Sequence, residues 1–184
     1  MFKHLDERVL GVILWLFNKV WALWKLPFDW KHSIVIPILK DGKDSTATSS
    51  YRLISLISVV CKLMEKMVNN RLVFFLEKNN LLYKFQSGFR KGRSVMDHIT
   101  ALANEARKSL NNQDSLLGVF LDIHKAYDSV WNDGLLYKII INLGINGRMF
   151  EWIRDFLSNR SFHVRVGQNL SSIFHTDKGI HSPG

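Results

Sequence analysis

A long apolar run near the start of the chain predicts a helix. Residues 9–24 are almost continuously apolar, and Asn18 and Lys19 are the polar interruptions. A membrane-spanning helix needs about 20 uninterrupted apolar residues, so this run predicts an amphipathic or buried helix that packs against protein rather than lipid. The Leu26–Pro27 step ends the helix, because the residue before a proline is pushed out of the α region.

Two extended segments separated by a polar loop follow this helix. Residues 33–38 are short and β-branched and predict a strand. Pro37 within it indicates a sheet edge or a strand end, because proline cannot donate a ladder hydrogen bond. Residues 51–60 form the second extended run. The loop between them, residues 40–50, is polar and carries two lysines, which predicts an exposed connection.

Two helices and a glycine-containing loop come next. Residues 62–78 place their apolar side chains near one stripe and predict a helix. Ser94 and Asp97 form a capping box, which predicts another helix over residues 95–110. Residues 86–94, between the two helices, contain two glycines and three cations. The glycines of this loop allow close approach of a ligand to its backbone. A solvated turn without a ligand is an equally good interpretation.

The last third of the chain mixes strands and helices. The apolar run at 116–121 has the length of a fully buried strand, and it ends on Asp122. After it, the pattern predicts a helix that is capped by Asp133 and ends at about Leu143, with Gly144 as the next residue. A second helix is predicted to begin at Asn146 and Gly147. Residues 162–175 are predicted to form a hairpin. Interspersed strands and helices predict the α+β or the mixed α/β class.

Composition and charge narrow the function. The chain has 184 residues, enough for one domain or for one domain and part of another. Hydrophobic residues make up 47% and charged residues 22%, which disfavours a disordered tail, a collagen-like rod and a disulfide scaffold. Lys and Arg number 25 against 16 Asp and Glu, a formal net charge of +9. We therefore expect a polyanionic partner, nucleic acid first and an anionic membrane second.

Several residue types are expected to be structural. The single cysteine, Cys61, predicts a buried thiol in a reducing compartment. The seven histidines have no metal-ligand spacing, so a zinc site is not expected. Glu65 and Glu77 lie in a predicted helix, and we expect both to be surface charges. Core packing is expected for the four N-terminal tryptophans, which are Trp15, Trp21, Trp24 and Trp30.

Asp122 is the first candidate for chemistry. A carboxylate at the end of a buried strand is costly unless a cation, backbone amides or a metal ion compensates its charge. The competing interpretation is a cap for the turn that follows, which is common at strand-to-helix junctions. Tyr127 would lie near the same end of the sheet, with Asp128 beside it.

The string FLDIHKAYDSV at 120–130 resembles the first catalytic motif of reverse transcriptases. Further segments follow the order found in polymerases of LINE-type (non-LTR, jockey-like) retrotransposons. They are IPILKDGKD at 36–44, YRLISL at 51–56, Lys62 with Glu65, QSGFR at 86–90 with 92–97, and 152–160 ending in FLSNR. Because these ordered segments cover most of the chain from about residue 9 to residue 180, the chain is identified by resemblance as a piece of such a polymerase.

The resemblance implies a fold and a set of site residues. The fold is a right-hand polymerase, with fingers over about 1–112 and the first part of the palm over about 113–184, as helices packed on a short, mainly antiparallel sheet. Asp122 matches a metal-binding aspartate, and the backbone at Ile123 would line the triphosphate pocket beside the metal. Tyr127 matches the steric gate, a ring that clashes with a ribose 2′-hydroxyl. The remaining implied contacts are Lys40 and Arg52 with the incoming phosphates, and Gln86, Gly88, Arg90, Lys91 and Arg93 with nucleic acid.

The resemblance also implies partners. The complete enzyme would use two divalent ions, Mg²⁺ or Mn²⁺, and would act on an RNA template, a DNA primer and deoxynucleoside triphosphates. No membrane partner is implied, and the oligomeric state is left open. The family implies a nuclear and cytoplasmic location.

Two departures from the family pattern limit the expected activity. The second catalytic motif, an aromatic residue with an Asp-Asp pair, is missing, because no two aspartates are adjacent in the 184 residues. His181 and Ser182 stand where proline and glutamine are expected, and Leu53 replaces a proline. We therefore predict that this polypeptide alone is inactive. Two alternatives stay open: a catalytically dead, basic nucleic-acid-binding relic of a mobile element, and a fragment that does not fold stably because of an unpaired sheet edge.

Overall fold

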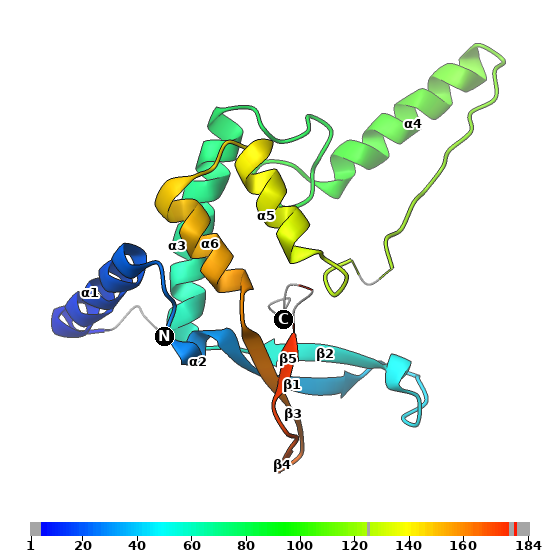
Figure 1. Ribbon diagram of the computed structural model, residues 1–184. Helices are drawn as coiled ribbons and strands as arrows, with labels where there is room; N and C mark the ends of the chain where they lie inside the picture. Colours follow the sequence, from blue (N-terminus) through cyan, green and yellow to red (C-terminus); the bar gives the residue numbers. More distant parts are fainter. Residues whose placement is uncertain (1–4, 125, 177–178, 180–184) are drawn as a thin grey trace. The chain divides into compact units, whose positions relative to one another are not determined.

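Figure 1 shows the computed structural model, which describes residues 5–124, 126–176 and 179. The helices are α1 (Glu7–Leu23), α2 (Phe28–Lys31), α3 (Val59–Lys78), α4 (Val95–Asn111), α5 (Asn132–Ile141) and α6 (Gly147–Leu157), with a 3₁₀ turn η2 (Thr48–Ser50). The strands are β1 (His32–Leu39), β2 (Tyr51–Leu56), β3 (Arg160–Val166), β4 (Asn169–Leu170) and β5 (Phe174–Thr176). The predicted α+β class is confirmed.

The chain divides into two units, each described by itself. One unit comprises Met1–Val73 and Lys125–Gly184, and the other comprises Phe74–His124. These units do not follow the expected boundary near residue 112, and the division into fingers and palm stays a prediction.

The strands of the first unit form a mainly antiparallel sheet. β1 pairs antiparallel with β2 from Ile34↔Leu56 to Leu39↔Tyr51. On its other side, β1 pairs parallel with β3, but only over its first four residues, His32–Val35. β3 pairs antiparallel with both β4 and β5 (Figure 1), which together replace the single returning strand of the predicted hairpin. Pro37 lies beyond the last β1–β3 pair, on a sheet edge as its sequence predicts.

The core of the first unit lies where α1, α2, α3 and α6 meet the start of β1. Its buried apolar side chains include Phe17, Val20, Trp30, Cys61, Met64, Val68, Trp152, Ile153 and Leu157. The predicted burial of Cys61 is confirmed, because the side chain is 0% exposed. Burial and the nearby Glu65 carboxylate raise the pKa of this thiol, since both disfavour a thiolate.

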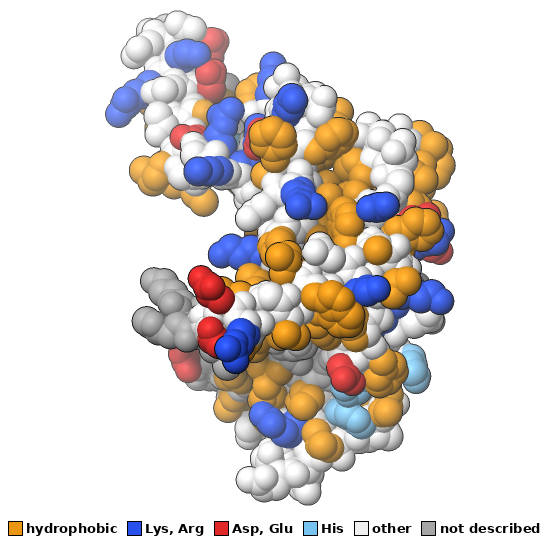
Figure 2. Space-filling view, turned by 90° about the vertical axis from the view of Figure 1, so that its left-hand side faces the viewer, with side chains coloured by type: hydrophobic (Ala, Val, Ile, Leu, Met, Phe, Trp, Pro, Cys, Tyr) orange, Lys and Arg blue, Asp and Glu red, His pale blue; other side chains and the backbone are white. Residues whose placement is uncertain are grey.

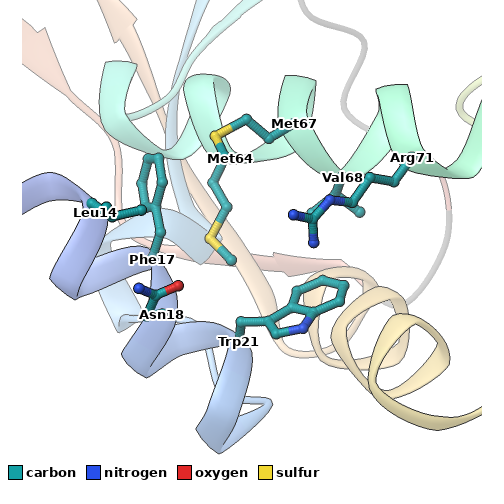
Figure 3. Close-up of a pocket in the computed structure, with 8 residues that line it drawn as sticks. All are labelled: Leu14, Phe17, Asn18, Trp21, Met64, Met67, Val68 and Arg71. Atoms are coloured by element: carbon teal, nitrogen blue, oxygen red, sulfur yellow. The ribbon is translucent and has the colours of Figure 1, made fainter.

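Helix α1 buries a narrow stripe of its apolar run. Phe17 and Val20 are buried, whereas Val12, Leu14 and Trp15 are 55–65% exposed. The buried stripe faces α3 across a small pocket of about 100 Å³ (Figure 3). The pocket residues are Leu14, Phe17, Asn18 and Trp21 of α1, and Met64, Met67, Val68 and Arg71 of α3. Among the described residues, no helix is long and apolar enough to cross a membrane.

The expected core packing of the N-terminal tryptophans is right for one of them and wrong for two. Trp30 is buried, and its ring makes an edge contact with Phe17 at 6.2 Å between centroids. Trp15 and Trp24 are exposed, and Trp21 lies at the α1–α3 pocket in partial contact with solvent. A helix on the surface of a unit can bury one face only, so an apolar residue type does not fix the burial of every member of the run.

The predicted strand at 116–121 is wrong. Residues 114–123 have no regular secondary structure, and Leu117, Phe120 and Leu121 are 82–91% exposed. A strand needs the backbone of a neighbouring strand to satisfy its amides and carbonyls. The unit that contains this segment, Phe74–His124, offers only helical and irregular backbone. Without such a partner, the apolar run stays extended and exposed.

Three predicted boundaries also need correction. The second extended run ends at Leu56 rather than at residue 60, because α3 begins at Val59. Asp133 is in the first turn of α5 and is not its cap, since Trp131 occupies the cap position. Helix α5 ends at Ile141 rather than at Leu143, and Gly144 beyond it has a positive φ of 64°. Asn146 occupies the predicted cap position of α6, without a side-chain hydrogen bond to the helix.

Candidate nucleotide and nucleic-acid site

The β1–β2 hairpin brings two predicted phosphate ligands, Lys40 and Arg52, to one face. Arg52 pairs with Ile38 in the register, and the amide of Lys40 donates to the carbonyl of Ser50 at 2.9 Å, which extends that register by two residues. Side chains at opposite and at alternate positions of an antiparallel pair share a face. Lys40 and Arg52 therefore lie on the same face of the hairpin, and both are exposed.

The loop after Lys40 is held by its own polar groups. The carboxylate of Asp44 accepts hydrogen bonds from the amide and the hydroxyl of Thr46, at 2.9 and 2.6 Å. These bonds lower the pKa of Asp44, because they favour the charged form. The Lys40 ammonium donates to the carbonyl of Ser49 at 2.9 Å, so its charge stays beside the hairpin.

The loop at 86–93 belongs to the other unit, and Arg90 anchors it. Its guanidinium binds Glu77 of α3 through two hydrogen bonds, Nε to Oε1 at 2.8 Å and Nη2 to Oε2 at 2.6 Å. Nη1 also donates to the carbonyl of Tyr83 at 3.1 Å. The pair lowers the pKa of Glu77 and raises that of Arg90. Glu77 lies at the surface, as we predicted, and its charge is paired with Arg90.

The other predicted nucleic-acid ligands of this loop are exposed. Gln86 donates through its Nε2 to the carbonyl of Gly88 at 3.2 Å, and Lys91 and Arg93 are exposed in the segment that follows. Phe89 at the loop tip is 90% exposed and was not predicted as a ligand. Exposed aromatic rings among cations are the usual surface for stacking unpaired bases. The alternation of rings and cations in YKFQSGFRK, residues 83–91, is the sequence signal that could have identified this surface.

Asp122 and Ile123 lie in the irregular, exposed part of the Phe74–His124 unit. Asp122 does not end a buried strand, so the predicted burial of its carboxylate is wrong. Tyr127 belongs to the other unit, where it lies half-exposed in a turn at 126–129. Across the described residues, no three His, Cys, Asp or Glu side chains form a cluster that could hold a metal ion.

A buried arginine supports the FLSNR segment, and sequence reasoning did not predict it. Arg160 is 3% exposed and donates through Nη1 to the carbonyl of Phe156 at 2.9 Å, with the Phe156 ring 4.7 Å from its guanidinium carbon. Burial lowers the pKa of Arg160, and the carboxylate of Glu65 opposes that shift. Glu65 also accepts a hydrogen bond from the thiol of Cys61 at 3.2 Å, so the predicted role of Glu65 as a surface charge is wrong.

Each unit carries exposed cations, Lys40 and Arg52 in one and Lys91 and Arg93 in the other. Figure 2 shows Lys and Arg side chains spread over one face among exposed hydrophobic ones. The fold is thus that of a basic α+β protein with cationic and aromatic loops.

The chain belongs to the reverse transcriptase family. A family profile described as reverse transcriptase (RNA-dependent DNA polymerase) matches residues 38–181. The chain is 34% identical over 171 residues to the RNA-directed DNA polymerase from mobile element jockey of Drosophila melanogaster, covering 93% of this chain and 18% of that protein.

Two further Drosophila melanogaster relatives are probable RNA-directed DNA polymerases. The one from transposon BS is 30% identical over 92% of this chain and 18% of its own length. The one from transposon X-element is 29% identical over 97% of this chain and 19% of its own length. The chain thus spans about a fifth of the curated relatives that it matches. The predicted resemblance to jockey-like retrotransposon polymerases is confirmed.

Proposed function

We propose that this chain provides the fingers and the first part of the palm of an RNA-directed DNA polymerase of a LINE-type retrotransposon. The observation that carries the proposal is the family match over residues 38–181, which contains every predicted site residue. The proposed reaction is the extension of a DNA primer on an RNA template. The proposed location of the protein is the nucleus and the cytoplasm.

In this proposal, the β1–β2 hairpin binds the triphosphate of the incoming nucleotide. The shared face of Lys40 and Arg52 supports this role. Arginine can bind two phosphate oxygens through its planar fork, whereas lysine contributes a compact charge. The ring of Tyr127 would face the sugar and exclude a 2′-hydroxyl.

The loop at 86–93 is proposed to contact the nucleic acid. Lys91 and Arg93 would neutralise phosphates, and Gln86 and Gly88 would lie near the template backbone. The role of Arg90 in this proposal is partly indirect, because its bidentate pair with Glu77 fixes the loop that carries the other cations.

Reverse transcriptases generally depend on divalent metal ions. We propose Mg²⁺, with Mn²⁺ as the substitute, and the Asp122 carboxylate with the adjoining Ile123 backbone as one part of the binding site. The described residues contain no complete metal cluster, and the sequence has no adjacent aspartates. We therefore propose that the 184-residue chain alone does not extend a primer.

Photo-crosslinking of a radiolabelled azido-dATP to the 184-residue chain tests the nucleotide site. Arg52→Ala should reduce the crosslinked fraction at subsaturating nucleotide by about tenfold, because a charge-assisted hydrogen bond contributes about 1.5–3 kcal/mol. Lys40→Ala should have a similar effect. Lys43→Ala is the matched control, because Lys43 is an exposed lysine of the same loop that lies outside the extended register. Equal labelling of Arg52→Ala and Lys43→Ala would contradict the proposed pocket.

A further inference from the structure

Gly179 lies against the turn that carries Tyr127. It is buried, and its amide donates to the carbonyl of Val130 at 3.0 Å. A Cβ atom built on Gly179 would lie 3.0 Å from the carbonyl oxygen of Asp128, 3.1 Å from its Cα and 3.2 Å from the carbonyl oxygen of Tyr127. All three are backbone atoms. The 126–129 turn is therefore packed directly on a glycine, with no space for a side chain between them.

Two separate features require glycine at this position. The backbone of Gly179 has a φ of +82°, a region that side-chain-bearing residues rarely adopt. The neighbouring atoms are backbone, so they cannot rotate away from a new methyl group as the end of a flexible side chain could. A methyl group at residue 179 would have to move the 126–129 turn itself. Gly167 has only the first feature, with a φ of +59° and nothing within 4 Å of its built Cβ.

We propose that Gly179 is a positioning residue for nucleotide selection. Its close packing and its hydrogen bond to Val130 hold the 126–129 turn, and thereby fix the direction of the Tyr127 ring. This inference rests on the proposed function, in which that ring faces the sugar of the incoming nucleotide. Any side chain at residue 179 displaces the ring and weakens the discrimination between deoxyribonucleotides and ribonucleotides.

The first test uses the 184-residue chain and does not depend on activity. Hydrogen exchange measured by mass spectrometry follows the amide of residue 179, which donates to the carbonyl of Val130, in the unmodified chain, in Gly179→Ala and in Gly167→Ala. Exchange at this amide should rise about tenfold in Gly179→Ala, because the added methyl group separates residue 179 from the turn. Gly167→Ala should leave exchange at residue 179 unchanged. Equal exchange in the two variants would overturn the proposal.

The second test measures sugar selection in a polymerase. A chimaera of the Drosophila melanogaster jockey polymerase carries this chain in place of its matching segment, and kcat/KM is measured for dTTP and for UTP. Gly179→Ala should lower the dTTP-to-UTP ratio about tenfold, whereas a loss of folded protein would reduce both values equally. Gly167→Ala should keep the ratio.

A double variant shows whether the effect passes through the ring. In a Tyr127→Ala background, Gly179→Ala should cause no further change in the ratio, because the ring that it displaces is gone. An unchanged ratio in Gly179→Ala alone, or an additive change in the double variant, would overturn the inference. If the unmodified chimaera is folded but extends no primer, the proposed function fails, and the exchange measurement still decides whether Gly179 holds the turn.

Discussion

The Asp155 side chain on α6 binds both the α1–α2 connection and α2, so its removal should lower the stability of the fold. Its Oδ1 pairs with the ammonium of Lys31 at 2.7 Å, and its Oδ2 accepts from the amide of Leu26 at 2.8 Å. The two charged side chains are only 11% and 21% exposed. Asp155→Ala would leave a buried ammonium and a backbone amide without this partner.

The magnitude follows from these two contacts. Breaking a buried ion pair costs about 3–5 kcal/mol, and partial solvent access here reduces that to about 2 kcal/mol. The lost amide acceptor adds about 1 kcal/mol. We expect Asp155→Ala to lower the free energy of unfolding by about 3 kcal/mol, which corresponds to a fall in Tm of roughly 6–12 °C for a domain of this size.

Urea and thermal unfolding followed by circular dichroism measure this loss. Glu151→Ala is the matched control, because Glu151 lies on the same helix and pairs with Arg154. The two side chains of that pair are 24% and 58% exposed, so its cation, unlike Lys31, is solvated when the partner is removed. Glu151→Ala should therefore cost less than about 1 kcal/mol. The double variant Lys31→Met with Asp155→Leu should recover most of the loss, because an apolar pair can replace a buried ion pair. Equal stabilities of Asp155→Ala and Glu151→Ala would refute the reasoning.

Three further predictions concern titration, reactivity and binding. Burial and the His163 ring, 4.9 Å away between ring centroids, lower the pKa of His32 in the folded chain. Neutral His32 therefore contributes fully to the stability of the fold above about pH 6.5, its pKa in the unfolded chain. This contribution should be lost as the pH falls through the lower pKa of the folded chain. His32→Gln should flatten the dependence of the urea midpoint on pH between about 7 and 5, and an unchanged dependence would contradict this prediction. The Cys61 thiol, buried and with a raised pKa, should react with iodoacetamide at pH 8 only after unfolding, and rapid labelling of the folded chain would contradict its burial. Phe89→Ala should weaken binding of single-stranded RNA by about 1–3 kcal/mol with an unchanged salt slope in fluorescence anisotropy, because stacking involves no counterion release. A changed slope with unchanged affinity would count against stacking.

Local features were the most predictable from the sequence. The capping box at Ser94 forms as expected, with the amide of Ser94 donating to the Asp97 carboxylate at 2.9 Å, and α4 begins at Val95. The edge position of Pro37 and the positive φ of Gly144 were predictable for the same reason. Each depends on residues within one or two turns of the chain.

Features that depend on distant partners were not predictable in this way. The apolar run at 116–121 has a strand pattern, but a strand also requires a neighbour, which its unit does not supply. The pairing of Arg90 with Glu77 joins residues 13 apart, and the charge pattern alone did not reveal it. Buried Arg160 lies near Glu65 only because β3 and α3 pack in one unit. The residue pattern singled out Asp122 and Tyr127, the other candidate site residues came from the family resemblance, and the roles of all of them stay predictions.

The most direct test of the central proposal is RNA-templated primer extension by the jockey chimaera that contains this chain. With Mg²⁺ and deoxynucleotides, the folded chimaera should extend the primer, and Asp122→Ala should abolish extension while leaving the circular dichroism spectrum unchanged. A folded chimaera that extends no primer, or one whose activity survives Asp122→Ala, would contradict the account.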